Sequence, residues 1–207
     1  MRGSPSRLSV SRETLTQTYF PKKGPELARY AELLETVAVE RGIIGPSEGP
    51  KVWERHIENC VPITTLFTEG ATVGDVGSGA GLPGIIIALA RPDLKITLIE
   101  PLQRRVDFLN EVIAELGLDV MVHRGKAKSL TKPFHYVTAR AVAPLARLIP
   151  STWHLVRPNG ALLAIKGESA AAELSAALLP KGATARIIEL NIGELPVSRI
   201  AEVIKAG

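Results

Sequence analysis

The stretch Ala71-Thr-Val-Gly-Asp-Val-Gly-Ser-Gly-Ala-Gly-Leu-Pro-Gly84 decides how the rest of this chain is interpreted. It begins with a β-prone run, continues through closely spaced glycines and leads into an apolar segment, 85–90, of helical length. This order predicts a strand, a tight loop and a helix. Because glycine lacks a Cβ atom, the loop can adopt positive φ and a ligand can lie directly against its backbone.

A carboxylate follows the next apolar run. Residues 95–99 are predicted to form a strand, and Glu100 comes directly after them. An acid at the tip of the second strand of such a unit is placed to bind two ribose hydroxyls. We therefore expect a nucleoside-containing cofactor. The candidate binding residues in this part of the chain are Asp75, Gly77, Gly79, Gly81, Leu82 and Glu100.

Two classes of cofactor share this geometry. The string Gly79-x-Gly81-x-x-Gly84 matches the dinucleotide fingerprint, so the pattern allows NAD. Counted from the turn glycine Gly77, however, a dinucleotide loop needs its third glycine at position 82, which is a leucine. S-adenosylmethionine has no pyrophosphate, and loop amides can hold its zwitterionic amino-acid end. The register favours S-adenosylmethionine over NAD and over a glycine turn without a ligand.

The composition is that of one ordinary domain. The 207 residues are 45% hydrophobic, which suffices for a core. There are 25 Lys and Arg against 21 Asp and Glu, a net charge of +4 that suits an anionic partner without requiring one. The single cysteine, Cys60, excludes an internal disulfide and a cysteine-based zinc site. With neither a membrane-spanning run nor a signal peptide, we expect a cytoplasmic protein.

The chain is predicted to have three parts. Residues 1–10 are expected to be a disordered tail or a tag remnant, 11–68 an N-terminal helical extension, and 69–207 the cofactor-binding domain. In the last part, strands are expected at 71–76, 95–99, 119–123, 135–140, 160–166, 183–190 and 197–204, and helices at 85–90, 103–116, 144–155 and 169–179. This alternation predicts an α/β fold, a doubly wound, mostly parallel, seven-stranded Rossmann-like sheet with ligands at the carboxyl ends of its strands.

Further candidates follow the later strands. The segment 124–128 contains small residues that allow its backbone to approach an adenine, while its lysines are interpreted as solvated. Arg140 ends the fourth strand, where a methyl acceptor would enter, and Lys166 ends the fifth. Arg55 and His56 lie on a predicted helix of the extension, and their spacing alone indicates a packed or surface histidine.

A motif is also missing after the fourth strand. Methyltransferases of exocyclic amines usually carry an Asn or Asp, Pro, Pro, aromatic loop there, whereas this chain reads Thr138-Ala-Arg-Ala-Val-Ala143. An amine acceptor is therefore disfavoured. A ring nitrogen such as guanine N7 has a free lone pair and needs no general base, so in-line placement and exclusion of water would suffice, with basic residues holding phosphates or O6.

Three motifs occur in a fixed order: Trp53-Glu-Arg-His-Ile57, Asp75-Val-Gly-Ser-Gly-Ala-Gly-Leu-Pro-Gly-Ile85, and Arg140-Ala141 followed by Ile165-Lys-Gly167. With them the chain resembles the RsmG family, also called glucose-inhibited division protein B, of bacterial 16S rRNA guanine-N7 methyltransferases. The resemblance implies methyl transfer from S-adenosylmethionine, leaving S-adenosylhomocysteine, to N7 of a guanosine in the 530 loop of 16S rRNA in the small ribosomal subunit. It also implies a cytoplasmic monomer without a metal.

Motif matching carries over the family's functional residues. Its cofactor contacts fall on Gly77, Leu82, Ala127, Lys128 and Arg140. Positions suspected of RNA binding or catalysis fall on Arg55, His56 and Lys166. Together with Arg140, which lies where the methyl acceptor would enter, they are the candidate catalytic residues.

The chain departs from the family pattern at several positions. Gly42 stands where many members have an asparagine, so an asparagine-dependent contact to the acceptor is not assumed. Lys128 replaces a glutamate, and only its backbone contact is carried over.

Other functions stay open at this point. A methyltransferase of the same fold could act on a small molecule or a protein. A non-enzymatic ribosome-assembly factor could keep the cofactor fold, and an NAD oxidoreductase could share the glycine loop.

Overall fold

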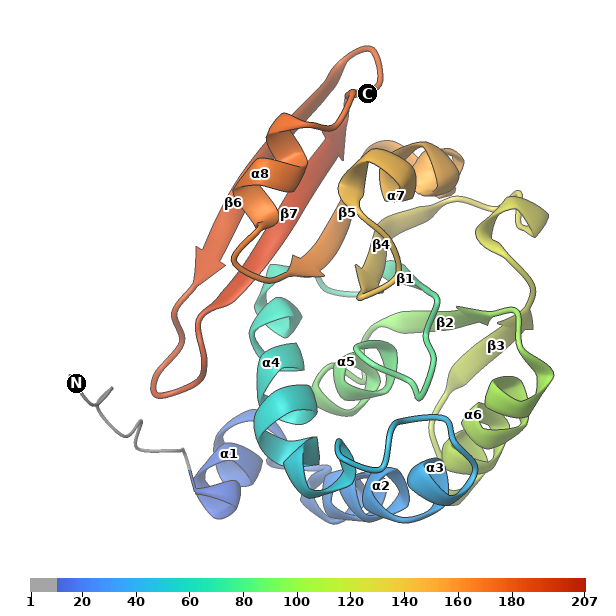
Figure 1. Ribbon diagram of the computed structural model, residues 1–207, viewed down its shortest axis with the longest axis vertical. Coiled ribbons are helices and arrows are strands. Elements are labelled where there is room, and N and C mark those ends of the chain that lie inside the picture. The colour runs from blue at the N-terminus through green and yellow to red at the C-terminus, as the bar shows by residue number, and fades with distance from the viewer. Residues whose placement is uncertain (1–10) are drawn as a thin grey trace.

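Seven strands form one sheet in the order β3-β2-β1-β4-β5-β7-β6 (Figure 1). The computed structural model describes residues 11–207, so the tail or tag remnant expected at 1–10 lies outside the described residues. Strands β1 to β5 run parallel, and β6 and β7 form an antiparallel hairpin at one edge. The strands are β1 (Thr72–Val76), β2 (Lys95–Glu100), β3 (Val120–Arg124), β4 (Phe134–Arg140), β5 (Val156–Lys166), β6 (Ala183–Leu190) and β7 (Ser198–Lys205). The predicted mostly parallel, seven-stranded Rossmann-like sheet is confirmed.

Helices cover both faces of the sheet. They are α1 (Arg12–Tyr19), α2 (Gly24–Glu35), α3 (Val37–Glu40), α4 (Glu58–Cys60), α5 (Gly84–Ala90), α6 (Gln103–Leu116), α7 (Leu145–Thr152) and α8 (Ala170–Ser175). The short helical turns are η1 (Gly49–Lys51), η2 (Val52–Ile57), η3 (Pro62–Leu66), η4 (Ala127–Ser129) and η5 (Trp153–Leu155). Helix α8 ends at Ser175, before the predicted end at Leu179.

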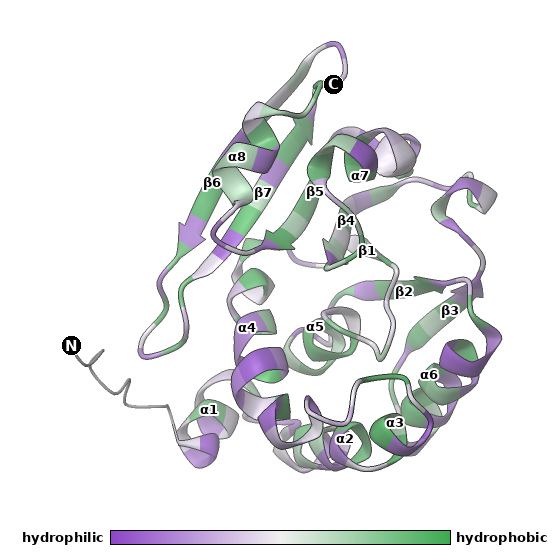
Figure 2. Cartoon of the chain, viewed as in Figure 1, coloured by the Kyte–Doolittle hydropathy of each residue, from purple (hydrophilic) through white to green (hydrophobic). Residues whose placement is uncertain are grey.

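Two hydrophobic clusters lie on opposite faces of the sheet. One joins helices α1 to α6 to side chains such as Val73, Leu98 and Ile200. The other joins α7 and the η5 turn to Val137 and Leu162. Figure 2 shows hydrophobic residues concentrated on α5, β5 and β7. The alternation of apolar side chains along the strands therefore serves both faces, as a sheet covered on both sides requires.

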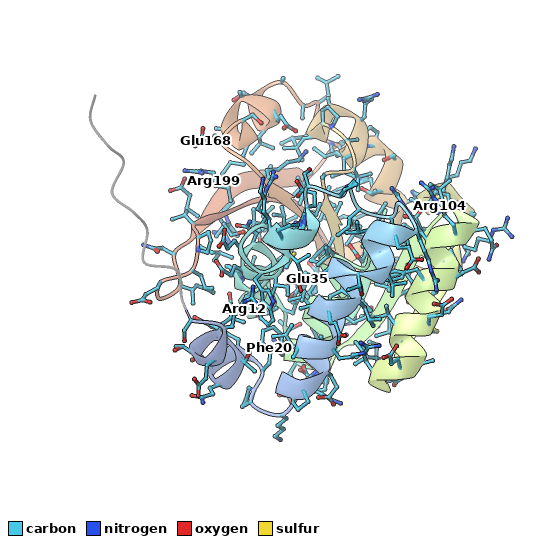
Figure 3. The ribbon with its side chains drawn as sticks, turned by 60° about the horizontal axis from the view of Figure 1, so that its bottom comes forward. Arg12, Phe20, Glu35, Arg104, Glu168 and Arg199 are labelled. Atoms are coloured by element: carbon cyan, nitrogen blue, oxygen red, sulfur yellow. The ribbon has the colours of Figure 1, made fainter. Side chains whose placement is uncertain are left out.

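The N-terminal extension shares the core of the sheet domain. Helix α2 buries one apolar face, including Leu27 and Leu34, against the rest of the protein. Figure 3 brings this side forward and shows α2 crossing the front of the molecule, with Arg12 and Phe20 of the preceding segment beside it. From α2, the fully buried Tyr30 donates a hydrogen bond of 2.8 Å from its hydroxyl to the carbonyl of Ala80 in the glycine loop. The extension thus helps to hold the loop that follows β1.

No helix in residues 11–207 has both the length and the apolar character needed to cross a membrane.

Candidate functional site

The glycine loop after β1 has the backbone conformation that its sequence predicts. Gly77, Gly79 and Gly81 have φ of +69°, +60° and +101°, a region that L-residues with a side chain rarely adopt. Space is also limited, since a Cβ atom at Gly81 would lie 2.5 Å from Cγ1 of Ile85 and 3.0 Å from the Tyr30 hydroxyl. Both the turn and the packing therefore require glycine at position 81.

A cavity of about 510 Å³ lies next to this loop, and we call it the donor cavity. It opens between the tips of β1 and β2, the β3–η4 connection and α7. Among the residues predicted to bind the cofactor, Gly77, Ala127 and Lys128 line it. Its other lining residues are Val76, Ile99, Pro101, Gly125, Lys126, Val142, Pro150, Ser151 and His154. Most of this wall is apolar, which suits a flat heterocycle more than a phosphate.

Glu100 lies at the tip of β2, where the sequence places it, and is almost fully buried. Its Oε2 accepts a hydrogen bond of 3.0 Å from the Gly79 amide, and its Oε1 accepts one of 2.9 Å from the Leu102 amide. Arg105 Nη1 lies 3.6 Å from the same carboxylate. Glu100 therefore holds the glycine loop, and its neighbours Ile99 and Pro101 line the donor cavity.

Asp75 faces the interior. Its Oδ2 accepts from the Gly84 amide and its Oδ1 from the Thr138 hydroxyl, each at 3.1 Å. Burial raises the pKa of this carboxyl group to about 6, although the hydrogen bonds from Gly84 and Thr138 oppose the change. Asp75 thus joins β1 to the start of α5 and to β4. Like Asp75, the predicted cofactor residue Leu82 packs in the core and does not line the donor cavity.

A second cavity, of about 450 Å³, lies at the tips of β4, β5 and β7, and we call it the acceptor cavity. Arg140 and Lys166, both predicted site residues, line it. So do Glu168 and Arg199, which Figure 3 shows close together at this end of the sheet. The remaining lining residues are Asn59, Ala141, Ile165, Gly167, Glu173, Val197 and Ser198.

The segment after β4 borders both cavities. Ala141 lines the acceptor cavity and its neighbour Val142 lines the donor cavity. Ala141 has φ of +55°, a left-handed conformation that is uncommon for a residue with a side chain. Val142 lies so close to the loop that a Cβ atom at Gly77 would be 2.7 Å from its Cγ2. Consecutive residues of the same segment therefore line the two cavities.

Three predicted site residues meet beside the acceptor cavity. Arg140 Nη2 donates to Nδ1 of His56 at 3.0 Å, and Arg140 Nη1 donates to the carbonyl of Arg55 at 3.4 Å. His56 Nε2 lies 2.9 Å from Oε2 of Glu48, although not in line for a well-formed hydrogen bond. The other oxygen of Glu48 accepts from Arg55 Nη1 at 2.7 Å. Burial and the charge of Arg140 lower the pKa of His56, and Glu48 opposes them.

Lys166 is engaged with protein groups. Its Nζ lies 2.8 Å from Oε2 of Glu173 and donates to the carbonyl of Ala143 at 2.7 Å. Glu173 also accepts from the Leu145 amide at 3.1 Å, and the hydrogen bond from Lys166 lowers its pKa. The Lys166–Glu173 pair therefore fixes the chain between β4 and α7, next to the acceptor cavity.

The sequence reasoning missed several residues of the site. Glu48 and Glu173 are ordinary surface glutamates by pattern, and only the fold brings them to His56 and Lys166. His154 donates from Nε2 to the Ala127 carbonyl at 3.1 Å and completes the donor cavity. Ser198 lines the acceptor cavity with a buried hydroxyl that has no hydrogen-bond partner among the described residues. The sequence contains no signal for Ser198 either, because the predicted strand 197–204 contains other polar residues, Arg199 and Glu202.

Metal ligands do not gather at either cavity: residues 11–207 contain no group of three or more His, Cys, Asp or Glu side chains that could hold a metal ion.

Solved structures with this fold include several methyltransferases. The chain superposes on a ribosomal protein L11 methylase from Lactobacillus delbrueckii with a TM-score of 0.57 at 16% identity, covering 72% of this chain and 77% of that one. It superposes on a methyltransferase from Pyrococcus furiosus with a TM-score of 0.56 at 13% identity, covering 73% and 83%. At these identities the likeness shows the fold alone.

Sequence comparisons are more specific. A protein from Streptomyces coelicolor named ribosomal RNA small subunit methyltransferase G is 51% identical over 194 residues, which cover 90% of this chain and 80% of that protein. A protein of the same name from Acidothermus cellulolyticus is 47% identical over 191 residues, which cover 88% and 86%. The family model described as GidB, rRNA small subunit methyltransferase G, matches residues 23–188. The chain therefore belongs to the GidB family.

Proposed function

We propose that this protein transfers a methyl group from S-adenosylmethionine to N7 of a guanosine in the 530 loop of 16S rRNA. The observation that carries the proposal is the pair of cavities at the carboxyl edge of the sheet, which are lined by consecutive residues, Ala141 on one side and Val142 on the other. A methyl donor in one cavity and an acceptor in the other would lie close to each other, on either side of the Ala141–Val142 segment. Relatives with about half of their residues in common are named as rRNA methyltransferases.

The donor cavity fits S-adenosylmethionine, which supplies an electrophilic methyl group on its sulfonium. Gly77 presents backbone without a side chain, and a Cβ atom there would meet Val142. The apolar walls at Ile99 and Ala127 suit an adenine, and Glu100 lies at the strand tip where ribose hydroxyls are bound in related folds. We assign Gly79, Gly81, Leu82 and Asp75 to shaping the loop, and we assign the backbone of Lys128 to the cofactor.

The acceptor cavity offers donors of hydrogen bonds to a guanine. Arg140 carries a guanidinium at its edge, and such groups pair with guanine O6 or with phosphate oxygens. Guanine N7 has a free lone pair at neutral pH, so no side chain has to remove a proton before transfer. The protein's contribution is then to hold N7 in line with the methyl group and to exclude water.

We assign different roles to the other candidate residues. The side chain of Arg55 is exposed, and its backbone carbonyl contacts Arg140, so we assign Arg55 to an RNA phosphate near the acceptor. Lys166 is held by Glu173 and Ala143, so it positions the segment after β4. Lys126 and Lys128 at the mouth of the donor cavity add positive charge on the same edge of the sheet. A ribosomal substrate implies action in the cytoplasm, and both cavities lie within one chain, which supports a monomer.

The proposal is tested with small ribosomal subunits from a strain that lacks this protein. The purified chain is incubated with these particles and methyl-labelled S-adenosylmethionine, and the RNA is then cleaved with borohydride and aniline, which marks N7-methylguanosine. We expect label in 16S rRNA and a single new cleavage in the 530 loop. An unlabelled 16S rRNA beside a labelled protein or small molecule would contradict the proposal and favour a different acceptor.

Cofactor identity is tested separately by calorimetry. We expect S-adenosylhomocysteine to bind and NAD to give no heat of binding. The reverse result would remove the methyltransferase interpretation and favour an oxidoreductase.

A further inference from the structure

We propose that Glu48 and His56 of the N-terminal extension are a positioning pair that holds Arg140 at the edge of the acceptor cavity. Neither residue lines that cavity. Both act on Arg140, the charged side chain that β4 contributes there. The inference rests on the proposed function only for what Arg140 does to the acceptor, because the arrangement itself consists of contacts within the protein.

The contact with Arg140 defines the tautomer of His56. A guanidinium has only donors, so the ring nitrogen that faces Arg140 Nη2 at 3.0 Å must present a lone pair. Nδ1 is therefore unprotonated, and the neutral ring carries its hydrogen on Nε2. A doubly protonated ring would direct an N–H group at the guanidinium and lose this hydrogen bond. Arg140 can keep this hydrogen bond only while His56 is neutral.

Glu48 lies on the other side of the ring. Its Oε2 is 2.9 Å from Nε2, the nitrogen that carries the hydrogen in this tautomer. A carboxylate beside Nε2 favours hydrogen at that position and so directs the lone pair of Nδ1 toward Arg140. The histidine side chain is 14% exposed and that of Glu48 is 24% exposed. The pair is therefore screened from water enough for the orientation to hold.

Charged groups from three elements face His56. Arg140 comes from β4, Glu48 from the turn before η1, and Arg55 from η2 itself. The two arginines lower the pKa of His56 and Glu48 raises it, while burial lowers it most. Farther away, the field of Arg140 also reaches Cys60, Asp75 and Tyr30, whose pKa values burial raises. The balance keeps His56 neutral at the pH of the cytoplasm.

The local backbone brings the pair into place. The turn η2 is wider than an α-helix, because the Glu58 amide donates to the Trp53 carbonyl five residues before it. Such wide turns occur frequently at functional sites. Here the widened turn carries His56, and its Arg55 carbonyl accepts the second hydrogen bond from Arg140. Side chain and backbone of η2 thus hold the same guanidinium.

The first test measures the histidine directly. The chain has four histidines, so ¹⁵N-histidine labelling with long-range ¹H–¹⁵N correlation resolves each ring, and the His56→Asn spectrum assigns the signal. In the wild-type protein without substrate, we expect His56 as the Nε2–H tautomer with a pKa below its ordinary value of 6.5. In Arg140→Ala the pKa should rise, and in Glu48→Gln it should fall further. An Nδ1–H tautomer, or a His56 pKa that is the same in the wild type and in Arg140→Ala, would overturn the inference.

The second test separates positioning from folding. His56→Asn retains an acceptor near the place of Nδ1, whereas His56→Ala does not. We expect methylation of small subunits to fall on the order of 50-fold in His56→Ala and to recover to within about threefold of wild type in His56→Asn. We expect Glu48→Gln to lower kcat about fivefold and to move the acid limb of the pH profile toward lower pH, following the pKa of His56. Affinity for S-adenosylhomocysteine should be unchanged in all three.

A matched control is Glu32→Gln, which breaks an exposed ion pair of α2 with Arg29. It should leave activity and the His56 pKa at wild-type values. Equal activity in the alanine and asparagine variants of His56, at equal thermal stability, would contradict the positioning role. A protein that shows the expected tautomer but methylates no RNA would contradict the proposed function and leave the pairing intact.

Discussion

The two cavities of this protein lie side by side but are built by different means. The donor cavity is shaped by the glycine loop, whose Gly77 is in the left-handed region, and by apolar walls. The acceptor cavity is edged by charged side chains, including Arg140 and Lys166, and each of these is held by side chains of other elements. Under the proposed function, a cofactor common to many enzymes would be bound by chain conformation, whereas the individual acceptor would be bound by side chains that are paired between elements.

This comparison also predicts which properties a substitution in each region should change. We call the glycine loop and the donor cavity the donor half, and the residues around the acceptor cavity the acceptor half. A substitution in the donor half should alter both cofactor affinity and folding stability, because the same glycines determine the loop conformation and its packing. A change in the acceptor half should alter transfer and leave cofactor affinity and folding largely intact. The following variants test this division.

Replacing Arg140 with alanine should have the largest effect. It removes the guanidinium at the acceptor cavity, and we expect kcat to fall on the order of 100-fold because the guanine loses its alignment. Affinity for S-adenosylhomocysteine should stay within about threefold of wild type, as measured by calorimetry. Arg186→Ala, which breaks an exposed pair with Glu202 in the terminal hairpin, is the matched control. Loss of cofactor affinity in Arg140→Ala would show that cofactor binding also depends on residues of the acceptor cavity.

The Asp75→Asn variant tests a buried carboxyl group beneath the glycine loop. The pKa of Asp75 is raised from 3.8 to about 6, so between these values the native state binds more protons than the unfolded chain. The stability contributed by the neutral form is present below about pH 4 and is lost as pH rises through about 6. At about 1.4 kcal/mol per pKa unit, this loss amounts to about 3 kcal/mol.

In Asp75→Asn this pH-dependent loss should be absent. The difference in unfolding free energy between variant and wild type, measured by urea titration, should therefore move in favour of the variant by about 3 kcal/mol from about pH 4 to about pH 8. A difference that does not change with pH would mean that Asp75 ionises normally in the folded protein.

Gly77→Ala, at the donor cavity, has a matched control in Gly117→Ala, at the C-terminal end of α6. Both glycines have positive φ, +69° and +58°, so each substitution should cost about 1–2 kcal/mol of stability. Only at Gly77 would the new Cβ atom meet Val142, since Gly117 faces open space. Calorimetry should show affinity for S-adenosylhomocysteine lowered about tenfold or more in Gly77→Ala and unchanged in Gly117→Ala. Equal affinities would mean that the loop does not contact the cofactor.

Ser198→Ala should have the smallest effect and the most distinctive one. Its hydroxyl is buried without a partner among residues 11–207, so removing it should leave stability equal or raise it by about 1 kcal/mol. If the hydroxyl contacts the acceptor, KM for small subunits should rise about threefold while cofactor affinity is unchanged. A lower stability with an unchanged KM would show that Ser198 is a structural residue.

The sequence predicts the donor half far better than the acceptor half. Glycine spacing, strand length and the position of Glu100 are local properties, and they specify the turn after β1 and the tip of β2. The mostly parallel, seven-stranded sheet follows from the alternation of strands and helices, whereas the order of its strands is known only from the structure. The same pattern assigns Asp75, Gly81 and Leu82 to the cofactor, whereas in the structure all three are buried. A glycine pattern cannot distinguish a residue that shapes the loop from one that lines the cavity.

The acceptor half is less accessible to sequence reasoning. Residues 48, 56 and 140 are brought together by packing of the extension against the sheet, and nothing in their local sequence predicts the contact. The spacing of His56 alone indicated a packed or surface residue, and its side chain is indeed mostly buried. That Arg140 is the partner of this histidine, however, could be identified only from the fold.

The most direct test of the two-cavity account is a crystal structure of the protein with S-adenosylhomocysteine. We expect the adenosyl group in the donor cavity, against Gly77 and Ala127, with the homocysteine directed toward the Ala141–Val142 step and the acceptor cavity free of cofactor. Binding of the adenosyl group beside Arg140 and Ser198 would contradict the account, because one cavity would then serve both ligands.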